Sequence, residues 1–348
     1  MSGRARRLVA AAPVLLLAAV SALGCQGLGV SRDEIPEASI AFVYTDSETA
    51  RRRADSIVEK MGPASVDPND DRAIAEVGEI SRYLSTLLGV KDRHSDDRFE
   101  GRLALLDPRT AAVTLVAGAR KGSVPQDWSP DHGRLLFSQV VHNDLPSLFE
   151  VDIATGEVSR LTHGQRAHPE GCYGPGGRIV YTAVDARSDR RDARIMITTP
   201  GGRPQRLSEA GYAFYPGCAP DGSAVTYTTF SEDGRVPRIM VRSPVLDGEP
   251  RLLAVGKEAS FSPDGSWIVY SARSHGSWRL WRIRPDGTGR ATLGHGGYDE
   301  HRPELSPDNR LVVYVADTKL HQQLYLRRVD GTGDRILLAD GDGDRPVW

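Results

Sequence analysis

The chain has 348 residues, of which 44 are basic and 46 are acidic, and its formal net charge is -2. This balance excludes the strongly basic surface that nucleic-acid binding needs. The length suits one large domain or two small ones, and a single repeat along most of the chain favours one.

Residues 1–24 are typical of an export signal. Three arginines precede an apolar stretch over residues 8–20, which is shorter than the roughly 20 residues needed to span a bilayer. Small residues before Cys25 resemble a bacterial lipobox, which predicts that Cys25 is lipidated and becomes the first mature residue. Gln26 stands where an inner-membrane retention signal has Asp, so the analogy favours the outer membrane. The alternative is an ordinary cleaved signal followed by an incidental cysteine.

Residues 25–38 are predicted to be a linker, and residues 40–45 to form a strand. Residues 46–100 differ from the rest of the chain, because apolar side chains recur there at steps of three and four, the period of an amphipathic helix. This segment is predicted to be a helical insertion. Residues 101–116 return to strand composition, with a turn between two strands.

The remainder of the chain repeats one turn, which reads Ser-Pro-Asp in three of its five copies and reads Ser-Pro-Asp-Gly at residues 262–265. Proline presets one turn residue, aspartate bonds its own backbone and glycine accepts a left-handed conformation, so the turn predicts a hairpin. A period of about 40 to 45 residues with four short strands per unit is typical of a β-propeller blade. The prolines recur at intervals of 45, 45, 43 and 44 residues, at Pro130, Pro175, Pro220, Pro263 and Pro307.

The chain ends supply the sixth blade. Residues 345–348 align with the start of an innermost strand, whereas residues 40–45 and 101–116 read as the other three strands of the same unit. We therefore predict an all-β, six-bladed propeller over residues 39–348, closed by its C-terminal strand, which removes an exposed sheet edge. A weaker alternative keeps the helices as a cap outside the blade count.

The repeat resembles the WD-like propeller repeat of TolB-type periplasmic proteins, in its Ser-Pro-Asp-Gly turn and in the following strand that ends in Tyr-Thr or Tyr-Ser. The resemblance covers residues 101–348 together with 40–45. It implies the fold and an exported location, but the same repeat serves many functions. TolB is not a lipoprotein and carries a separate amino-terminal α/β domain that this chain lacks. The resemblance implies the TolB architecture for this chain, but it does not imply the Tol-Pal partnership.

Cys172 and Cys218 occupy nearly equivalent places in consecutive repeats, which puts them on neighbouring innermost strands. In an exported protein such a pair predicts a disulfide. The alternative, two small buried hydrophobic side chains, fits the spacing equally well.

The loops that lead from the fourth strand of one unit into the first strand of the next differ most between repeats. Four of them place a large polar or aromatic residue before proline, and these residues are predicted to surround one mouth of the central channel. Arg302 and Arg345 are predicted to bind an acidic ligand or a peptide terminus. The alternative pairs them with nearby acids. The candidate ligand-binding residues are His168, Tyr215, Asp299, Glu300, His301, Arg302, Asp344 and Arg345.

No catalytic residue and no metal site is assigned from the sequence. Asp340, Asp342 and Asp344 alternate like calcium ligands, but the chain lacks the acid expected at the twelfth position of a calcium-binding loop. A loosely bound divalent cation in the channel stays open as an alternative. His168 and His301, with the acids beside His301, would be the ligands of a metal-dependent hydrolase or lyase acting on a carbohydrate or peptide.

The sequence therefore predicts a non-enzymatic, lipid-anchored propeller that needs no cofactor, is monomeric and touches the membrane through its anchor only. Its expected partner is an envelope protein or a peptidoglycan-associated component, with no role for nucleic acid. A third alternative is a peptidase-derived propeller that binds peptides without cleaving them, because no Gly-x-Ser-x-Gly sequence is present.

Overall fold

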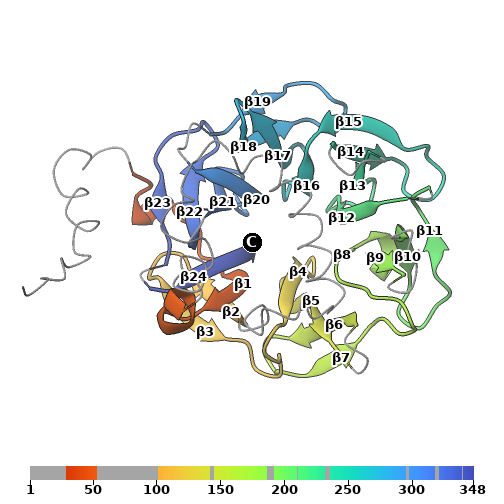
Figure 1. The fold of residues 1–348 in the computed structure, drawn as a ribbon, viewed down its shortest axis with the longest axis horizontal. Coiled ribbons are helices and arrows are strands. Elements are labelled where there is room, and N and C mark those ends of the chain that lie inside the picture. The colour runs from red at the N-terminus through yellow and green to blue at the C-terminus, as the bar shows by residue number, and fades with distance from the viewer. Residues whose placement is uncertain are drawn as a thin grey trace, which may run out of the picture.

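The computed structural model describes residues 29–52, 101–141, 145–185, 192–209, 211–231, 236–294, 298–317, 321–338 and 340–348. These residues form six four-stranded antiparallel sheets arranged around a central axis (Figure 1). The prediction of a six-bladed β-propeller is confirmed.

Each blade is described from its innermost to its outermost strand. The first consists of β24 (Asp342–Val347), β1 (Ile40–Thr45), β2 (Arg102–Asp107) and β3 (Ala112–Leu115). The second consists of β4 (Val124–Trp128), β5 (Arg134–Val140), β6 (Pro146–Asp152) and β7 (Val158–Arg160). The third consists of β8 (Gly171–Tyr173), β9 (Ile179–Val184), β10 (Ala193–Thr198) and β11 (Gln205–Arg206). The fourth consists of β12 (Ala213–Cys218), β13 (Val225–Phe230), β14 (Pro237–Arg242) and β15 (Arg251–Val255). The fifth consists of β16 (Lys257–Phe261), β17 (Ile268–Ser274), β18 (Ser277–Ile283) and β19 (Ala291–Thr292). The sixth consists of β20 (Asp299–Leu305), β21 (Leu311–Asp317), β22 (Gln322–Arg328) and β23 (Arg335–Ile336).

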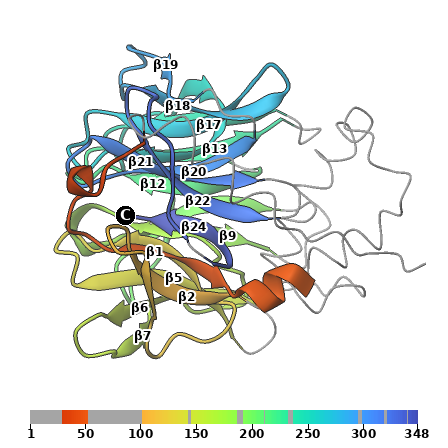
Figure 2. The same ribbon diagram turned by 90° about the vertical axis from the view of Figure 1, so that its left-hand side faces the viewer.

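The ring closes as predicted, because the last strand of the chain pairs with the first (Figure 2). Ala41 lies opposite Val347 and Thr45 opposite Asp342 in the antiparallel pairing of β1 with β24. The indole N–H of Trp128, in the second blade, donates to the carbonyl of Val347 at 3.3 Å. The closure of the ring is thus stabilised both by the pairing of β24 with β1 and by a hydrogen bond from the second blade.

The repeated turn folds through side-chain hydrogen bonds to its own backbone. In the second blade the hydroxyl of Ser129 donates to Asp131 at 2.5 Å and accepts from the N–H of Arg134 at 2.9 Å. His132 has φ of 53°, in the left-handed region for which this turn most often supplies glycine. The repeat is therefore structural and assigns no function to its serines and aspartates.

The hydrophobic core lies between neighbouring blades rather than at the centre of the ring. Phe42 and Leu106 of the first blade pack in one cluster with Val313 and Leu324 of the sixth. Neighbouring blades thus cover both faces of the second strand in a blade. In the third blade this strand is β9, and all six of its side chains are buried. This explains why such strands read as continuous apolar runs.

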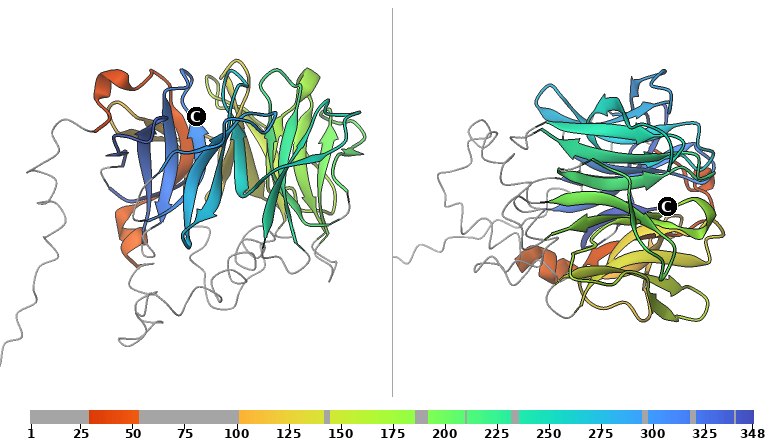
Figure 3. Two further views of the ribbon diagram at one scale, coloured as in Figure 1. Left: turned by 90° about the horizontal axis from the view of Figure 1, so that it is seen from above. Right: turned by 90° about the vertical axis from the view of Figure 1, so that its right-hand side faces the viewer.

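Residues 29–38, predicted as a linker, pack against the blades. Val30 and Ile35 are buried in the cluster between the first and sixth blades, and Glu34 pairs with Arg328 at 2.6 Å. A short helix over residues 47–52 follows β1. It lies on the face of the ring opposite the 3-10 helix η1 (Arg32–Glu34) (Figure 3). The rest of the predicted insertion, the export signal and Cys25 lie outside the described residues. Among the described residues, no helix has the length and apolar character to cross a membrane.

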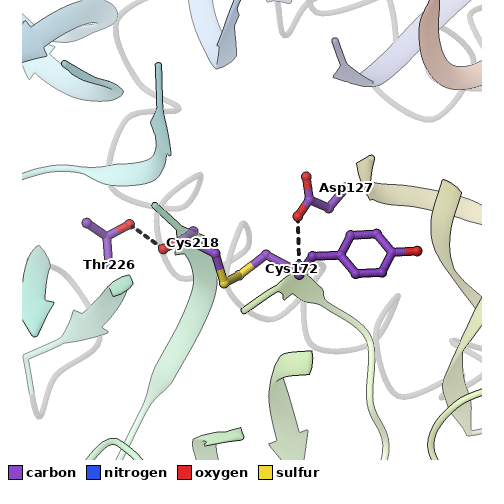
Figure 4. Close-up of a disulfide and its surroundings, with 6 residues drawn as sticks. Asp127, Cys172, Cys218 and Thr226 are labelled. Carbon is purple, nitrogen blue, oxygen red and sulfur yellow. Dashed lines mark hydrogen bonds between the residues drawn. A yellow bond between two sulfur atoms is a disulfide. The ribbon is translucent and has the colours of Figure 1, made fainter. Parts of the chain in front are cut away.

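Cys172 and Cys218 form a disulfide between β8 and β12 (Figure 4). Their α-carbons are 5.8 Å apart, within the range that this bond accepts. The bond links the innermost strands of the third and fourth blades, and its presence suits an oxidising compartment.

Replacing both cysteines by alanine is expected to lower the free energy of unfolding by about 2 to 4 kcal/mol, because the bond closes a loop of 46 residues in the unfolded chain. Urea unfolding of the oxidised wild type and of the double variant measures this loss. Reductant should destabilise the wild type by a similar amount and leave the variant unaffected. Equal stability of the oxidised wild type and the variant would contradict the prediction.

Candidate binding site in the central channel

The innermost strands present one residue per blade at the same place in the repeat. This place is three residues before the residue that opens the turn, such as Phe261 in the fifth blade or Leu305 in the sixth. We call these six residues the channel ring. Its members are Pro125, Glu170, Tyr215, Glu258, Arg302 and Arg345.

A β-bulge sets the direction in which the side chains of most channel-ring residues point. The pairing register shifts at this place in each described inner strand except β8. Tyr215, Glu258, Arg302 and Arg345 all have φ between 52° and 58°, the conformation by which a bulge re-aims a side chain. Proline follows three of these residues. It fits there because an innermost strand has a partner on one side only and needs no N–H for the channel side.

Arg302 is held between two carboxylates. Its guanidinium Nε lies 3.2 Å from Asp344 Oδ1 and 3.9 Å from Glu258 Oε1, and its backbone N–H donates to Glu258 Oε2 at 3.1 Å. Burial disfavours its charge, but Asp344 and Glu258 outweigh that effect and raise the pKa of Arg302. Arg302 is therefore fixed in position while its side chain stays 21% exposed.

Arg345 lies in the next blade, and its Nε is 3.8 Å from Asp344 Oδ2. Burial and the neighbouring charge of Arg302 lower the pKa of Arg345. Two guanidinium groups thus share Asp344 in a partly enclosed site. An anion placed between them would relieve the repulsion.

Glu258 has basic neighbours on both sides. Lys257 Nζ lies 3.7 Å from its carboxylate and His301 Nδ1 lies 3.9 Å away. Burial alone would raise its pKa, but Lys257, Arg302 and His301 together lower the pKa of Glu258 to about 2. Lys257 and His301 both contact the ring of Trp278, which positions them.

A second layer of polar side chains lies two residues further along the strands. Asp127 and Glu304, which we call the deep carboxyls, each stand directly before the residue that opens the turn. Asp127 accepts the N–H of Tyr173 at 2.8 Å (Figure 4), and Glu304 accepts the hydroxyl of Ser260 at 2.6 Å. Burial raises the pKa of Asp127 to about 7, and burial together with Asp127 raises the pKa of Glu304 to about 8.

Glu170, a member of the channel ring, is almost fully buried. It is 3% exposed, and its Oε2 accepts the N–H of Tyr215 at 2.8 Å and the hydroxyl of Thr182 at 3.0 Å. Its other oxygen, Oε1, has no hydrogen-bond partner. Burial raises the pKa of Glu170, against the opposing effect of Arg345 and Arg302, whose charges reach it.

The structure brings five of the predicted residues together: Tyr215, His301, Arg302, Asp344 and Arg345. It does not bring His168 to the ring. That side chain is 4% exposed, packs edge-on against Tyr181 and lines a separate groove of about 580 Å³ on the third blade. Burial and nearby arginines lower its pKa to about 4, so His168 is neutral at pH 7.

Glu300 and Asp299 take part in contacts between blades. Glu300 is 1% exposed; it accepts from Arg327, in β22 of the same blade, at 2.8 Å, and from the backbone N–H of Leu280, in the fifth blade, at 3.3 Å. Asp299 accepts the backbone N–H of Trp278, in the fifth blade, at 2.9 Å. The alternative that paired the arginines with nearby acids is thus correct for Asp344, which contacts both Arg302 and Arg345, and not for Asp299 and Glu300. Asp299 and Glu300 also do not form a ligand set with His168 and His301. Among the described residues, no three acid, histidine or cysteine side chains gather where they could hold a metal ion.

Sequence reasoning missed Glu170, Glu258 and the deep carboxyls. The search for a residue before proline selected His168, because proline in that repeat comes two residues earlier than in the others. Counting back three residues from the turn, from Tyr173, would have found Glu170. The same count would have found Glu258, which alanine follows in place of proline.

Comparison with known proteins supports the fold. No family model matches the chain. It is 25% identical to the uncharacterized protein Atu1656 of Agrobacterium fabrum over 216 residues, 59% of this chain and 69% of that protein. Its structure is similar to TolB from Acinetobacter baumannii, with a TM-score of 0.64, 17% identity, and coverage of 89% of this chain and 66% of TolB. A putative TolB from Agrobacterium tumefaciens gives a TM-score of 0.58, 21% identity, and coverage of 69% of this chain and 88% of that one.

These similarities define the chain as a propeller with the TolB-type fold, and the predicted resemblance is confirmed at the level of the fold. The chain spans just under two thirds of the Acinetobacter TolB chain. At these identities, activity and partners do not follow from the likeness.

Proposed function

We propose that this protein is a non-enzymatic binding module of the bacterial envelope, which recognises a carboxylate of its partner at the channel ring. The observation that carries this proposal is the pair Arg302 and Arg345, which project from neighbouring blades and both contact Asp344, while Glu258 contacts Arg302 alone among these two. A carboxylate supplied by a partner would lie between the two guanidinium groups and offset their mutual repulsion.

The charges around the ring favour an anionic group. Three basic side chains, Lys257, Arg302 and Arg345, lie around three acids, Glu170, Glu258 and Asp344, and burial raises the pKa of Glu170, so the site carries an excess of one positive charge when Glu170 is protonated. Partial burial strengthens the attraction, because a low local dielectric screens charge less than water does.

An exported location agrees with the disulfide and with the likeness to TolB proteins in fold. Lipid anchoring at Cys25 in the outer membrane, a monomeric state and a peptidoglycan-associated or protein partner belong to the same proposal. The fold supplies a rigid scaffold on which irregular inner strands present a recognition surface.

The test uses two short peptides, the N-acetylated tripeptide alanyl-alanyl-norleucine as the free acid and the same peptide as its C-terminal amide. The acid is expected to bind at least 10-fold more tightly in calorimetric titration, because a charge-assisted hydrogen bond contributes about 1.5 to 3 kcal/mol. Arg302→Gln and Arg345→Gln should each remove most of this preference. Arg206→Gln, on the exposed outermost strand β11, is the matched control and should bind as the wild type does.

Equal binding of acid and amide by the wild type would overturn the proposal. The enzymatic alternative has its own measurement. A stoichiometric metal found by elemental analysis of purified protein, and lost in His301→Ala, would contradict a non-enzymatic role that needs no cofactor.

A further inference from the structure

The channel below the two arginines holds acceptors that lack a cationic partner. Asp127 and Glu304 are bonded to a backbone N–H and to a hydroxyl, respectively, and neither has an ion pair among the described contacts. Glu170, almost fully buried, leaves one oxygen without any hydrogen bond. An unfilled buried acceptor is costly, and a bound donor would remove that cost.

The two layers also have a regular spacing. Glu304 follows Arg302 by two residues in β20, and the β-bulge at Arg302 keeps their α-carbons no further apart than the roughly 7 Å that two residues of an extended strand span. A ligand that carries an anion at one end and a cation at the other, separated by about this distance, would meet both layers at once. A lysine residue at the end of a peptide has this separation between its carboxylate and its ammonium group.

We infer that the channel takes the carboxyl end of a peptide whose last residue has a basic side chain. The carboxylate lies between Arg302 and Arg345, and the ammonium group reaches the deep carboxyls. The last backbone N–H of the peptide donates to the open oxygen of Glu170. This inference rests on the proposed function and adds to it the identity of the terminal residue.

An organic cation fits this arrangement better than a metal ion does. Asp127 and Glu304 are close enough to influence each other electrostatically, but within the described part of the chain no three ligand side chains converge on one point. A metal cage needs such convergence. A long, flexible side chain with three N–H donors can instead bridge acceptors that stand apart.

The deciding experiment compares two N-acetylated tripeptide acids, alanyl-alanyl-lysine and alanyl-alanyl-norleucine, in calorimetric titrations of the mature, disulfide-bonded protein. The lysine peptide is expected to bind at least 10-fold more tightly. The double variant Asp127→Asn, Glu304→Gln should bind both peptides with the affinity that the wild type has for the norleucine peptide. Both substitutions keep side-chain size and remove only charge. Glu157→Gln, at an exposed position, is the matched control.

A second readout separates direct contact from a structural effect. The deep carboxyls hold protons near neutral pH, so an arriving ammonium group displaces them. The binding enthalpy of the lysine peptide should therefore change between phosphate and Tris buffers, whereas that of the norleucine peptide should not.

The outcomes distinguish this inference from the proposed function. Equal binding of the two peptides overturns the inference and leaves carboxylate recognition intact. Failure of both peptides to bind overturns both. Tight binding of calcium or manganese chloride without peptide, abolished in the double variant, also overturns the inference, because the cation of the deep layer would then be a metal.

Discussion

Deletion of residues 342–348, which form β24 and the last residue, is expected to abolish the soluble folded monomer. The strand supplies the inner edge of the first blade and buries Val347 and Trp348 against its neighbours. Its loss leaves the edge of β1 unpaired and opens the ring. The expected cost exceeds about 5 kcal/mol, which is comparable to the whole stability of many domains. Size-exclusion chromatography and circular dichroism measure the result.

A synthetic peptide of residues 340–348 provides the matched test of this explanation. Added during refolding, it should restore the monomer, because an extended peptide can add itself to a free sheet edge. A peptide of the same composition in scrambled order should not. A deletion variant that remains monomeric and unfolds at the wild-type urea concentration would show that closure through β24 is not needed for stability.

Removal of the deep carboxyls is expected to stabilise the protein at alkaline pH. Asp127 and Glu304 keep their protons in the folded state up to pH values of about 7 and 8, whereas the unfolded chain releases them near the ordinary pKa values of 3.8 and 4.5. The unfolded state therefore binds fewer protons over this range, and stability falls as pH rises from about 5 to 8. One pKa unit corresponds to about 1.4 kcal/mol, and the pKa values of Asp127 and Glu304 lie about two and three units above pH 5, so the expected loss between pH 5 and pH 8 is on the order of 7 kcal/mol.

Urea unfolding at pH 5 and at pH 8 measures this effect in the wild type and in the double variant Asp127→Asn, Glu304→Gln. All other titrating groups are common to both proteins, so the difference between them isolates the two carboxyls. The variant should be nearly as stable as the wild type at pH 5 and more stable at pH 8. Glu157→Gln should follow the wild type at both pH values. A double variant less stable than the wild type at pH 8 would show that the ionised carboxyls are favourably bonded in the folded protein.

The sequence by itself determined the blade count, the turn of each repeat and the closure of the ring. These features depend on local chemistry. Proline and aspartate at fixed offsets specify each hairpin, and the sequence identifies residues 40–45 and 345–348 as members of a split blade. Cys172 and Cys218 lay at equivalent positions, but only the distance between their α-carbons decided that they bond.

Only the tertiary structure decided which polar side chains share the channel. Proline after Tyr215, Arg302 and Arg345 marked these residues in the sequence, whereas Glu258 lies at an equivalent β-bulge without a following proline, and the pairing of β16 with β17 was needed to find it. Glu300 does not join the channel residues, because it pairs with Arg327 of β22, a contact that the sequence does not predict. The deep carboxyls, distant in the chain, influence each other because ring closure brings the second and sixth blades to the two sides of the first.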